Sequence, residues 1–525
     1  MVAIKRALIS VSNKDGLESL AKVLISIGVE IISTGGTARF ISSLGIKVRP
    51  IGEVTGFPEM LDGRVKTLHP KIHGGLLYLR SKPEHIEQAR QHGIAPIDMV
   101  VVNLYPFQKT VSREGVKLEE AVENIDIGGP SIVRSAAKNY ASVAVLTNPS
   151  QYAEVMKELQ ASSASLSIET LKRLAVEAFK LTSEYDSSIY GYLKNTLSPQ
   201  QEQRAESSFA PEIALAFEKA QDLRYGENPH QRAAFYRSAN RRESSVASAK
   251  QLHGKEFSYN NIMDMDAALE AVKEFSTPAA CIIKHSTPCG VATADTLARA
   301  YADALECDKL SAFGGIIGFN MKVDINTAEA ILSSGFIECI IAAGYEQNAL
   351  QRLMTRENLR LVSIEPFKPF KDKDELHIRK VAGGALVQER DLQDLDRSQL
   401  KIVTQQKPTA EEVDALLFAW KVVKHVKSNA IVLTQGTKTV GIGAGQMSRV
   451  DSVYMALHKA GDRSKGAVLA SDAFFPKEDA VELAVKAGVT SIIQPGGSKA
   501  DEKIVALANH KNISMVFTGI RHFRH

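Results

Sequence analysis

The chain has 525 residues, of which 44% are hydrophobic and 24% charged, and its 64 Lys and Arg against 60 Asp and Glu give a formal net charge of +4. This length predicts three to four packing units of about 150 residues each, and the near-neutral charge excludes a protein that coats nucleic acid. No apolar run approaches the ~20 residues of a membrane span, and the four cysteines are too few for a disulfide scaffold. The first residues lead into a strand-like segment without a signal-peptide pattern, so we expect a cytoplasmic enzyme.

The first part of the chain alternates short apolar runs with helical patterns. Apolar residues recur at helical spacing from Asp15 to Ile27, and apolar runs predict strands at 7–12, 29–32, 98–104 and 142–146. This alternation indicates a parallel α/β sheet, in which ligands bind beyond the carboxyl ends of the strands. Those ends carry the polar segments Ser12-Asn13-Lys14, Ser33-Thr34-Gly35-Gly36-Thr37 and Asn103-Leu104-Tyr105-Pro106.

The segment Ser33–Thr37 has the composition of a phosphate-binding loop. Its glycines let backbone N–H groups approach phosphate oxygens, and the helix that follows presents its positive N-terminus. The same residues are also typical of a plain strand-to-helix turn with Thr as the N-cap. No Gly-Lys-Ser/Thr follows, so the segment is not a Walker loop.

The loop 62–75 is rich in cations. Arg64, Lys66 and Lys71 lie in it, and the loop fits an anion site and a solvated surface loop about equally well. His69 and His73 have the spacing of a metal-ligand pair, but Pro70 interrupts the helix that would direct both at one ion, so we expect no metal here.

A further constellation precedes a long helical region. In the segment 124–138, Ser131 is a candidate N-cap for a helix that carries Arg134 and Lys138 on one face. Taken alone, this pattern fits a capped surface helix better than a site. Residues 147–211 are mostly helical in pattern, and we expect the main domain boundary near 195–210.

In the second half, the apolar run 279–283 predicts a buried strand that ends at Lys284-His285. A Lys and a His at the end of a core strand are well placed for acid–base chemistry, although a histidine in a turn is also often only structural. Pro288-Cys289 resembles part of a zinc-deaminase signature. However, no His-x-Glu precedes it and position 292 is Ala, so we expect no zinc.

The pattern Thr409-x-x-Glu412 is a capping box at the start of a helix whose apolar face carries Leu416, Trp420 and Val423. Three lysines lie along another face of this helix, which is interpreted as its solvated face: Lys421, Lys424 and Lys427. The glycine-rich segment 441–449 lacks a dinucleotide-binding spacing but fits an anion loop with Arg449. In the segment 471–476, Asp472 lies beside two phenylalanines, which suits a flat heteroaromatic ligand.

Taken together, these segments resemble the bifunctional purine-biosynthesis family that combines aminoimidazole carboxamide ribonucleotide (AICAR) formyltransferase with inosine monophosphate (IMP) cyclohydrolase. The resemblance covers nearly the whole chain in family order. It is carried by the segments 33–37, 63–75, 100–107, 125–139, 223–231, 284–291, 311–319, 420–432, 441–451, 471–476, 492–498 and 517–525.

The resemblance implies an α/β fold: an N-terminal methylglyoxal-synthase-like parallel-sheet domain, followed by two cytidine-deaminase-like α/β/α subdomains without catalytic zinc. The cyclohydrolase region is expected at 1–199, with its core at about 1–147, and the formyltransferase region at 200–525. Family members are homodimers, so we expect a homodimer that acts on small molecules, with no nucleic-acid or membrane partner.

For formyl transfer, the resemblance implies 10-formyltetrahydrofolate as the formyl donor. His285 is the expected general base for the AICAR amine, and Lys284 is expected to tune it and to stabilise the oxyanion. Residues expected to hold the nucleotide are Arg224, Tyr225, Gly314, Glu338, Asn429 and Arg449, the two arginines suiting its phosphate or its carboxamide. Residues expected on the folate side are Asp472, Gln494, Pro495 and Arg521.

For cyclisation of formyl-AICAR to IMP, Lys66 is the expected oxyanion stabiliser. The expected proton relay is Tyr105, Asp126 and Lys138. Residues expected to bind the ribonucleotide are Ser12, Asn13, Lys14, Ser33, Thr34, Gly35, Gly36, Thr37, Arg64 and Thr67. The resemblance thus favours the phosphate-loop interpretation of 33–37.

Two other functions remain as alternatives: a nucleotide-sensing regulatory protein and a monofunctional cyclohydrolase with a degenerate second half. A regulatory module needs the phosphate loop but not the set Lys66, Tyr105, Asp126 and Lys138, and Lys284-His285 argues against a degenerate second half. No catalytic metal is expected, and the sequence leaves a structural monovalent cation open.

Overall fold

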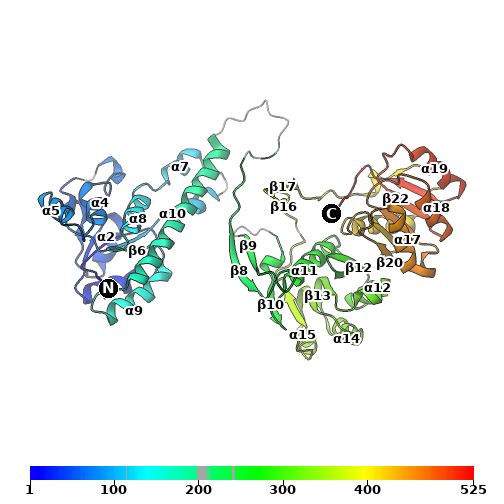
Figure 1. Cartoon of the computed structure of the whole chain (residues 1–525), viewed down its shortest axis with the longest axis horizontal. Helices are drawn as coiled ribbons and strands as arrows, with labels where there is room; N and C mark the ends of the chain where they lie inside the picture. The colour runs from blue at the N-terminus through cyan, green and yellow to red at the C-terminus, as the bar shows by residue number, and fades with distance from the viewer. Residues whose placement is uncertain (59, 114, 198–208, 210–211, 239–242, 370) are drawn as a thin grey trace. The chain divides into compact units, whose positions relative to one another are not determined.

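The computed structural model describes residues 1–58, 60–113, 115–197, 209, 212–238, 243–369 and 371–525. The chain divides into two compact units, Met1–Ala210 and Pro211–His525 (Figure 1). The expected boundary between the two regions, at 199/200, lies outside the described residues. None of the helices in the described ranges is both long enough and apolar enough to cross a membrane.

The core of the first unit is a parallel sheet. Its strand order within the described residues is β4-β3-β2-β5-β6, with β2 (Arg6–Val11), β3 (Glu30–Ser33), β4 (Arg49–Pro50), β5 (Met99–Asn103) and β6 (Ala144–Leu146). Every pairing is parallel, which confirms the predicted parallel α/β sheet. Ile9 lies opposite Ser33 and Val11 opposite Asn103, so the carboxyl ends of β2, β3 and β5 meet at one edge.

Helices cover this sheet, because strands such as β2 and β5 are apolar on both faces and Ala7, Leu8, Ile9, Val100 and Val101 are fully buried. The helices are α1 (Leu17–Ser26), α2 (Gly35–Ser43), α3 (Ile51–Thr55), α4 (Pro70–Leu77), α5 (Pro83–Gln91), α6 (Phe107–Val111), α7 (Leu118–Glu123), α8 (Gly128–Lys138), α9 (Tyr152–Ala161) and α10 (Ile168–Leu197). The long helix α10 runs beside α8 and β6 (Figure 1). A short ribbon pairs β1 (Val2–Ala3) with β7 (Ser165–Leu166).

The predicted N-cap of the helix that carries Lys138 was wrong. Helix α8 begins at Gly128, so Ser131 lies inside its first turn, and its hydroxyl donates to Ile127 O instead. The side chain that satisfies an amide at this helix start is Asp126, whose Oδ1 accepts from Gly129 N at 2.8 Å. Helix α8 is thus capped by a residue that the sequence analysis assigned to catalysis.

The second unit is built on one large mixed sheet. Of the strands in the described part of the chain, twelve form it in the order β10-β15-β14-β13-β11-β12-β20-β19-β21-β22-β23-β18. Its first half contains β10 (Lys250–His253), β11 (Ala279–Lys284), β12 (Thr287–Thr293), β13 (Ile316–Val323), β14 (Cys339–Tyr345) and β15 (Arg360–Ser363). Its second half contains β18 (Lys401–Ile402), β19 (Ile431–Gln435), β20 (Lys438–Gly443), β21 (Val468–Ser471), β22 (Ser491–Gln494) and β23 (Ser514–Phe517).

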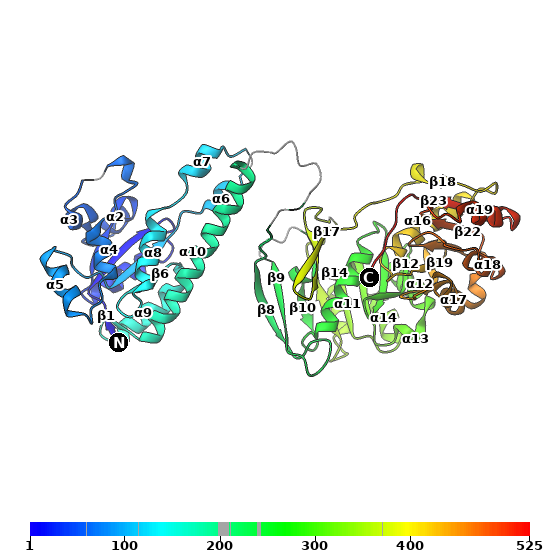
Figure 2. The same cartoon turned by 45° about the horizontal axis from the view of Figure 1, so that its top comes forward.

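The two halves repeat one topology. In each, a hairpin (β11–β12 or β19–β20) is followed by three mutually parallel strands, the first of which pairs antiparallel with the hairpin. Strands β12 and β20 join the halves, and Figure 2 shows β12 and β19 in the middle of this unit with β22 and β23 toward one end. This duplication agrees with the expected pair of α/β/α subdomains.

Helices accompany both halves. The first half has α11 (Tyr259–Val272), α12 (Leu297–Cys307), α13 (Lys309–Ala312), α14 (Ile325–Ser333) and α15 (Gln347–Leu353), and the second has α16 (Ala410–Val423), α17 (Arg449–Ala460), α18 (Asp479–Lys486) and α19 (Asp501–His510). Among the described residues of this unit, two ribbons lie outside the large sheet: β8 (Phe217–Leu223) with β9 (Ala233–Ser238), and β16 (Leu376–Val381) with β17 (Gly384–Glu389). The predicted capping box of α16 is confirmed, because Thr409 and Glu412 satisfy each other's amides.

Helices α12 and α17 pack closely against the backbone of the hairpins β11–β12 and β19–β20. A Cβ added at Gly290 of β12 would lie 1.9 Å from Ala304 O of α12, and one at Gly441 of β20 would lie 2.1 Å from Ala456 O of α17. Any side chain at these positions would displace a helix. Glycine at equivalent places in both hairpins therefore sets the distance between helix and sheet in each half.

A buried carboxylate connects the two halves beneath the sheet. Glu274 follows α11 and is almost fully buried, and its Oε1 lies 2.5 Å from Lys371 Nζ, 2.8 Å from Lys424 Nζ and 2.9 Å from His425 Nε2. The interpretation of Lys424 as part of a solvated helix face was therefore wrong, since this side chain is 8% exposed. The pKa of Glu274 is well below its usual range: burial opposes ionisation, but the hydrogen bond from His425 and the two ammonium groups outweigh it.

We predict that Glu274→Gln destabilises the second unit by about 3 to 5 kcal/mol, because it leaves buried ammonium groups without a counter-charge. Urea unfolding followed by tryptophan fluorescence measures this loss, since Trp420 of α16 is the only tryptophan in the chain. Glu482→Gln, at an exposed position of α18, is the matched control and is expected to change the stability by no more than about 0.5 kcal/mol. Equal stability of both variants would contradict this role of Glu274.

Candidate active sites

Asn103 organises the carboxyl edge of the first unit's sheet. Its Oδ1 accepts from Ser12 N at 2.7 Å, Ser12 Oγ at 2.8 Å and Asn13 N at 2.9 Å, and its Nδ2 donates to Asn13 O at 3.1 Å. The end of β5 thereby fixes the loop after β2, and Lys14 extends from that loop into solvent. The sequence analysis placed Asn103 at this edge but assigned it no role.

The segment 33–37 is anchored to β2 by its hydroxyl groups, while its two glycines are exposed to solvent. Helix α2 begins at Gly35, so a threonine, Thr34, is its N-cap, although the Thr34 side chain makes no capping hydrogen bond. Thr37 lies inside the helix, and its Oγ1 accepts from Val11 N and donates to Val11 O. Thr34 Oγ1 and Ser10 Oγ lie 3.0 Å apart. Gly35 and Gly36 are exposed at the start of α2. The hydroxyls thus anchor the loop, while glycine amides at a helix N-terminus face outward and can receive an anion.

Lys66 and Asp126 lie at the same edge. A Cβ added at Gly35 would lie 3.6 Å from Lys66 Nζ, and one at Gly128 would lie 2.6 Å from Thr67 Oγ1, so the loop after η1 (Leu61–Gly63) packs between α2 and α8. Burial raises the pKa of the Asp126 carboxyl, although the amides of Gly129 and Tyr105 and the Lys66 ammonium act in the opposite direction. The structure therefore brings together Lys66, Thr67, Asp126 and the backbone of Tyr105.

Lys138 lies apart from this cluster, and Arg64 is paired with a residue outside it. Lys138 is the last residue of α8, roughly 15 Å along the helix from Gly128 at 1.5 Å per residue. This separation is too long for a hydrogen bond between Lys138 and Asp126 of the same chain. Arg64 is exposed and pairs with Glu123.

The two histidines of this region have local partners. His69 caps α4, where its Nδ1 accepts from Lys71 N at 3.1 Å. His73 Nδ1 lies 2.9 Å from Ser135 Oγ of α8. Within the described ranges, no group of three or more His, Cys, Asp or Glu side chains is arranged to hold a metal ion.

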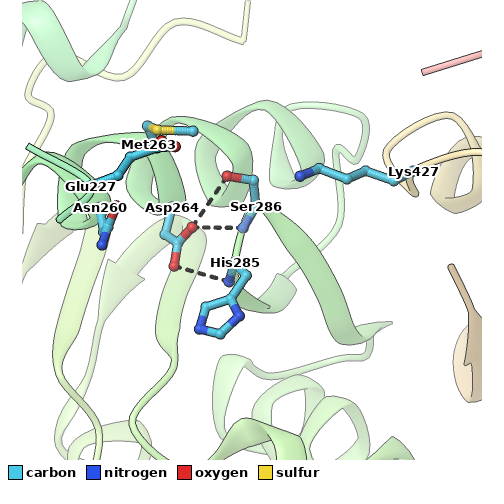
Figure 3. A pocket seen from close by; sticks show the side chains of 7 residues that line it. All are labelled: Glu227, Asn260, Met263, Asp264, His285, Ser286 and Lys427. Atoms are coloured by element: carbon cyan, nitrogen blue, oxygen red, sulfur yellow. Dashed lines mark hydrogen bonds between the residues drawn. The ribbon is translucent and has the colours of Figure 1, made fainter. Parts of the chain in front are cut away.

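The second unit contains an open pocket with about 530 Å³ of empty space beside the β11–β12 hairpin (Figure 3). It is lined by Glu227, Asn260, Met263, Asp264, His285, Ser286 and Lys427. His285 is exposed at the tip of the hairpin. Lys427 comes from the second half of the sheet, so both halves contribute to this pocket. The sequence analysis assigned a role only to His285 among these residues.

Lys284 and Gly314 are neighbours beside this pocket. Lys284 Nζ donates to Phe313 O at 2.6 Å and would lie 3.3 Å from a Cβ at Gly314. Glu338 is near the start of β14, and its Oε1 accepts from Asn261 Nδ2 at 3.0 Å and from Arg360 Nη1 at 3.3 Å. The last residue of β11 and the segment that precedes β13 thus meet at one ammonium group.

Arg449 and Asp472 form a buried ion pair in the second half. The Arg449 guanidinium donates to Asp472 Oδ1 and Ser471 Oγ through Nη1 and to Asn429 Oδ1 through Nη2. The Arg449 side chain is 5% exposed and that of Asp472 is fully buried. Two residues that were expected on different substrates are therefore bound to each other.

The remaining expected residues differ in accessibility. Gln494 and Pro495 are buried, and Gln494 Oε1 accepts from Gly496 N, so these two residues shape the backbone at the end of β22. Arg521 is exposed and lies over the Phe523 ring at 4.3 Å. Arg224 is also exposed and lies over the ring of Tyr225 at 5.6 Å. The two arginines are free to meet anionic groups of a ligand.

Sequence reasoning missed Asp264 and the position of Lys427. Asp264 lies on helix α11, where it is 9% exposed, and an acidic residue between the apolar Met263 and Met265 was the available signal. Lys427 follows the lysine stripe of α16, and its neighbours gave no sign that it turns toward a pocket formed by residues more than 140 positions earlier.

Comparison with known proteins identifies the family to which the chain is related. A model of the AICARFT/IMPCHase bienzyme family matches residues 136–459, and a model of the MGS-like domain matches residues 16–131. Proteins named "Bifunctional purine biosynthesis protein PurH" are 51% identical in Halalkalibacterium halodurans, over 99% of this chain and 100% of that protein, and 50% identical in Bacillus subtilis, over 100% of both.

A solved structure titled "Crystal structure of ForH" is 33% identical over 35% of this chain and 94% of that chain, with a TM-score of 0.33, and adds nothing to this comparison. The family model spans more than half of the chain, and the relatives match it from end to end. The MGS-like match also agrees with the fold expected for the first unit. The chain therefore belongs to the AICARFT/IMPCHase bienzyme family.

Proposed function

We propose that this bifunctional enzyme of purine biosynthesis uses two separate sites, one in each unit. It transfers a formyl group to AICAR and closes the product to IMP, the last two steps of IMP synthesis. The pocket at His285 supports formyl transfer in the second unit. The observation that carries the proposal for the first unit is the convergence of Lys66 and Asp126 with the glycine amides at the start of α2.

In formyl transfer, the AICAR amine attacks the formyl carbon of 10-formyltetrahydrofolate, and the bond from that carbon to folate N10 breaks. The amine is conjugated with the imidazole ring and is a weak nucleophile, so it needs positioning and removal of a proton. His285 accepts this proton, and folate N10 takes one up as it leaves. Lys284 stabilises the oxygen of the tetrahedral intermediate, since its hydrogen bond to Phe313 O leaves two ammonium protons.

In ring closure, the carboxamide nitrogen of formyl-AICAR attacks the formyl carbon. The formyl oxygen takes up two protons, which replace those lost by the carboxamide and formamide nitrogens, and leaves as water. Lys66 stabilises the charge on that oxygen. Asp126 accepts the amide proton, and Tyr105 supports it from the adjacent loop. Lys138 was expected in the same relay, but its position at the far end of α8 gives it no contact with Asp126 in one chain.

For ligand binding, we assign the nucleotide of the first unit to the loop 12–14, the segment 33–37, Arg64 and Thr67. In the second unit, nucleotide binding is assigned to Arg224, Tyr225, Gly314, Glu338, Asn429 and Arg449. The folate site is assigned to Arg521. Asp472, Gln494 and Pro495 are assigned to the same site, because their carbonyl groups support the backbone around Arg521. Four of these residues are exposed cations that suit anionic ligands: Lys14, Arg64, Arg224 and Arg521.

A homodimer in the cytoplasm is the assembly that we propose. The exposed apolar side chains of Phe313, beside Lys284, and Met447, beside Asn429, support burial of this region by a second copy. Sedimentation of the purified protein tests the dimer, and a mass of one chain at micromolar concentration would contradict it.

Incubation of the protein with AICAR and 10-formyltetrahydrofolate tests the proposed function, with IMP as the expected product. We predict that His285→Ala lowers formyl transfer by about 100- to 10,000-fold and leaves the cyclisation of supplied formyl-AICAR unchanged. Chromatographic separation of AICAR, formyl-AICAR and IMP measures both steps. Loss of both steps would contradict separate sites, and a protein that binds nucleotides but forms no IMP would be a regulatory module.

The complementary prediction concerns the first unit. We predict that Lys66→Ala slows ring closure by about 100- to 1,000-fold, so that formyl-AICAR accumulates while formyl transfer continues. Arg134→Ala is the matched control, because this exposed cation of α8 packs on the Phe179 ring and has no assigned role. Unchanged IMP output from Lys66→Ala would remove Lys66 from the mechanism.

The pH dependence of ring closure tests Asp126. A carboxyl must be ionised to accept a proton, and burial raises the pKa of Asp126 above its usual 3.8. We therefore predict that kcat for cyclisation falls as the pH decreases through this raised value. Asp126→Asn is expected to retain a low cyclisation rate that does not show this decrease at acidic pH (the acidic limb of the pH profile). An identical acidic limb in the variant would show that another group titrates.

A further inference from the structure

The hairpin turn that presents His285 has an unfavourable backbone conformation. Lys284 pairs with Thr287 across β11 and β12, so the loop consists of His285 and Ser286 alone. Their φ angles are +54° and +58°, in the left-handed region. Two-residue turns of this kind strongly favour Asn and Gly, because a Cβ in that region costs about 1 to 2 kcal/mol per residue. A turn made of His and Ser therefore needs support from another element.

Asp264 provides this support from helix α11. Its Oδ1 accepts from Ser286 N at 2.6 Å and from Ser286 Oγ at 3.3 Å, and its Oδ2 accepts from His285 N at 3.2 Å. The dashed lines in Figure 3 run from the carboxylate to these three donors and not to the imidazole. One carboxylate thus binds both amides of the turn and leaves the ring of His285 available to the pocket.

The same helix also holds a residue of the proposed nucleotide site. Asn261 lies one helical turn before Asp264, and its Nδ2 donates to Glu338 Oε1 at 3.0 Å. The start of α11 is fixed by a capping box between Ser258 and Asn261. Helix α11 therefore sets the position of the His285 turn relative to Glu338.

We propose that Asp264 is a positioning residue for formyl transfer, which holds the His285–Ser286 turn in its left-handed conformation and so fixes where the imidazole meets the attacking amine. This inference rests on the proposed role of His285 as the general base. Asp264 acts through the backbone and takes no part in the transfer of protons.

The first test is Asp264→Ala, assayed in the full-length protein. Displacement of a catalytic group by about 1 Å can cost 100-fold in rate, so kcat for formyl transfer is expected to fall by about that factor. The KM for AICAR is expected to stay within about twofold, and cyclisation of formyl-AICAR in the first unit is expected to stay unchanged. A large rise in KM with unchanged kcat would overturn the positioning role.

The decisive test is rescue by glycine at position 286. Glycine adopts positive φ without the penalty of a Cβ, so Ser286→Gly in the Asp264→Ala background is expected to recover at least ~10-fold in kcat. Ser286→Ala in the same background removes the same hydroxyl but keeps the Cβ, and is expected to recover nothing. The Ser286→Gly single variant sets the upper limit of the recovery. Equal kcat values for the two double variants would overturn the proposal.

Two further variants keep the outcomes distinct. Asp264→Asn retains the shape of the side chain and one acceptor, and the same glycine rescue applies to it if Asp264→Ala fails to fold, as judged by Trp420 fluorescence. His285→Ala is assayed in parallel. If His285→Ala is fully active, the base assignment fails together with the inference; if His285→Ala is inactive and the glycine rescue is absent, only the role of Asp264 is lost.

Discussion

The pairing of β12 with β20 is the constraint on which the second unit depends. Ala292 lies opposite Lys438, and Thr439 Oγ1 both accepts from Val291 N and donates to Val291 O across the junction. Without this junction the chain would form two separate α/β/α layers, and neither would contain a complete pocket. Lys427 belongs to one half and His285 to the other, so the pocket exists only because the two sheets are continuous.

Buried charge strengthens the same connection on one side of the sheet. Glu274 belongs to the first half, whereas Lys424 and His425 belong to the second. A carboxylate buried among three cationic or polar partners is costly to separate from them, because each would be left without a counter-charge. The cluster therefore resists sliding of α16 past α11, which would move Lys427 relative to the His285 turn. Glycine at 290 and 441 adds to this rigidity by close backbone packing.

The features that the sequence predicted well are those whose cause is local. The strands of the first unit follow from continuous apolar runs, and the capping box of α16 from residues three positions apart. The misplaced N-cap of α8 was a local error, but two others arose where the partner is distant in sequence. Lys424 was interpreted as solvated because Glu274 lies 150 positions away, and Asp264 escaped notice because it acts on a turn 21 positions later. The roles of individual residues were inferred from the family resemblance, whereas the burial and the hydrogen-bond partners of their side chains are visible only in the three-dimensional structure.

The ion pair between Arg449 and Asp472 changes how charge must be distributed in the transferase pocket. A guanidinium bound to Asp472, Ser471 and Asn429 has its charge compensated before a ligand arrives. Its remaining N–H donors can still bind a neutral group, so Arg449 suits the carboxamide of AICAR better than the phosphate. The phosphate then needs cations whose charge is uncompensated. Arg224, Lys284 and Lys427 pair with no carboxylate among the residues that the structure describes, and Arg224 is the most exposed of the candidates named for the nucleotide. The fixed N–H donors of Arg449 at the AICAR carboxamide and the exposed cations at its phosphate would together orient the AICAR amine toward His285.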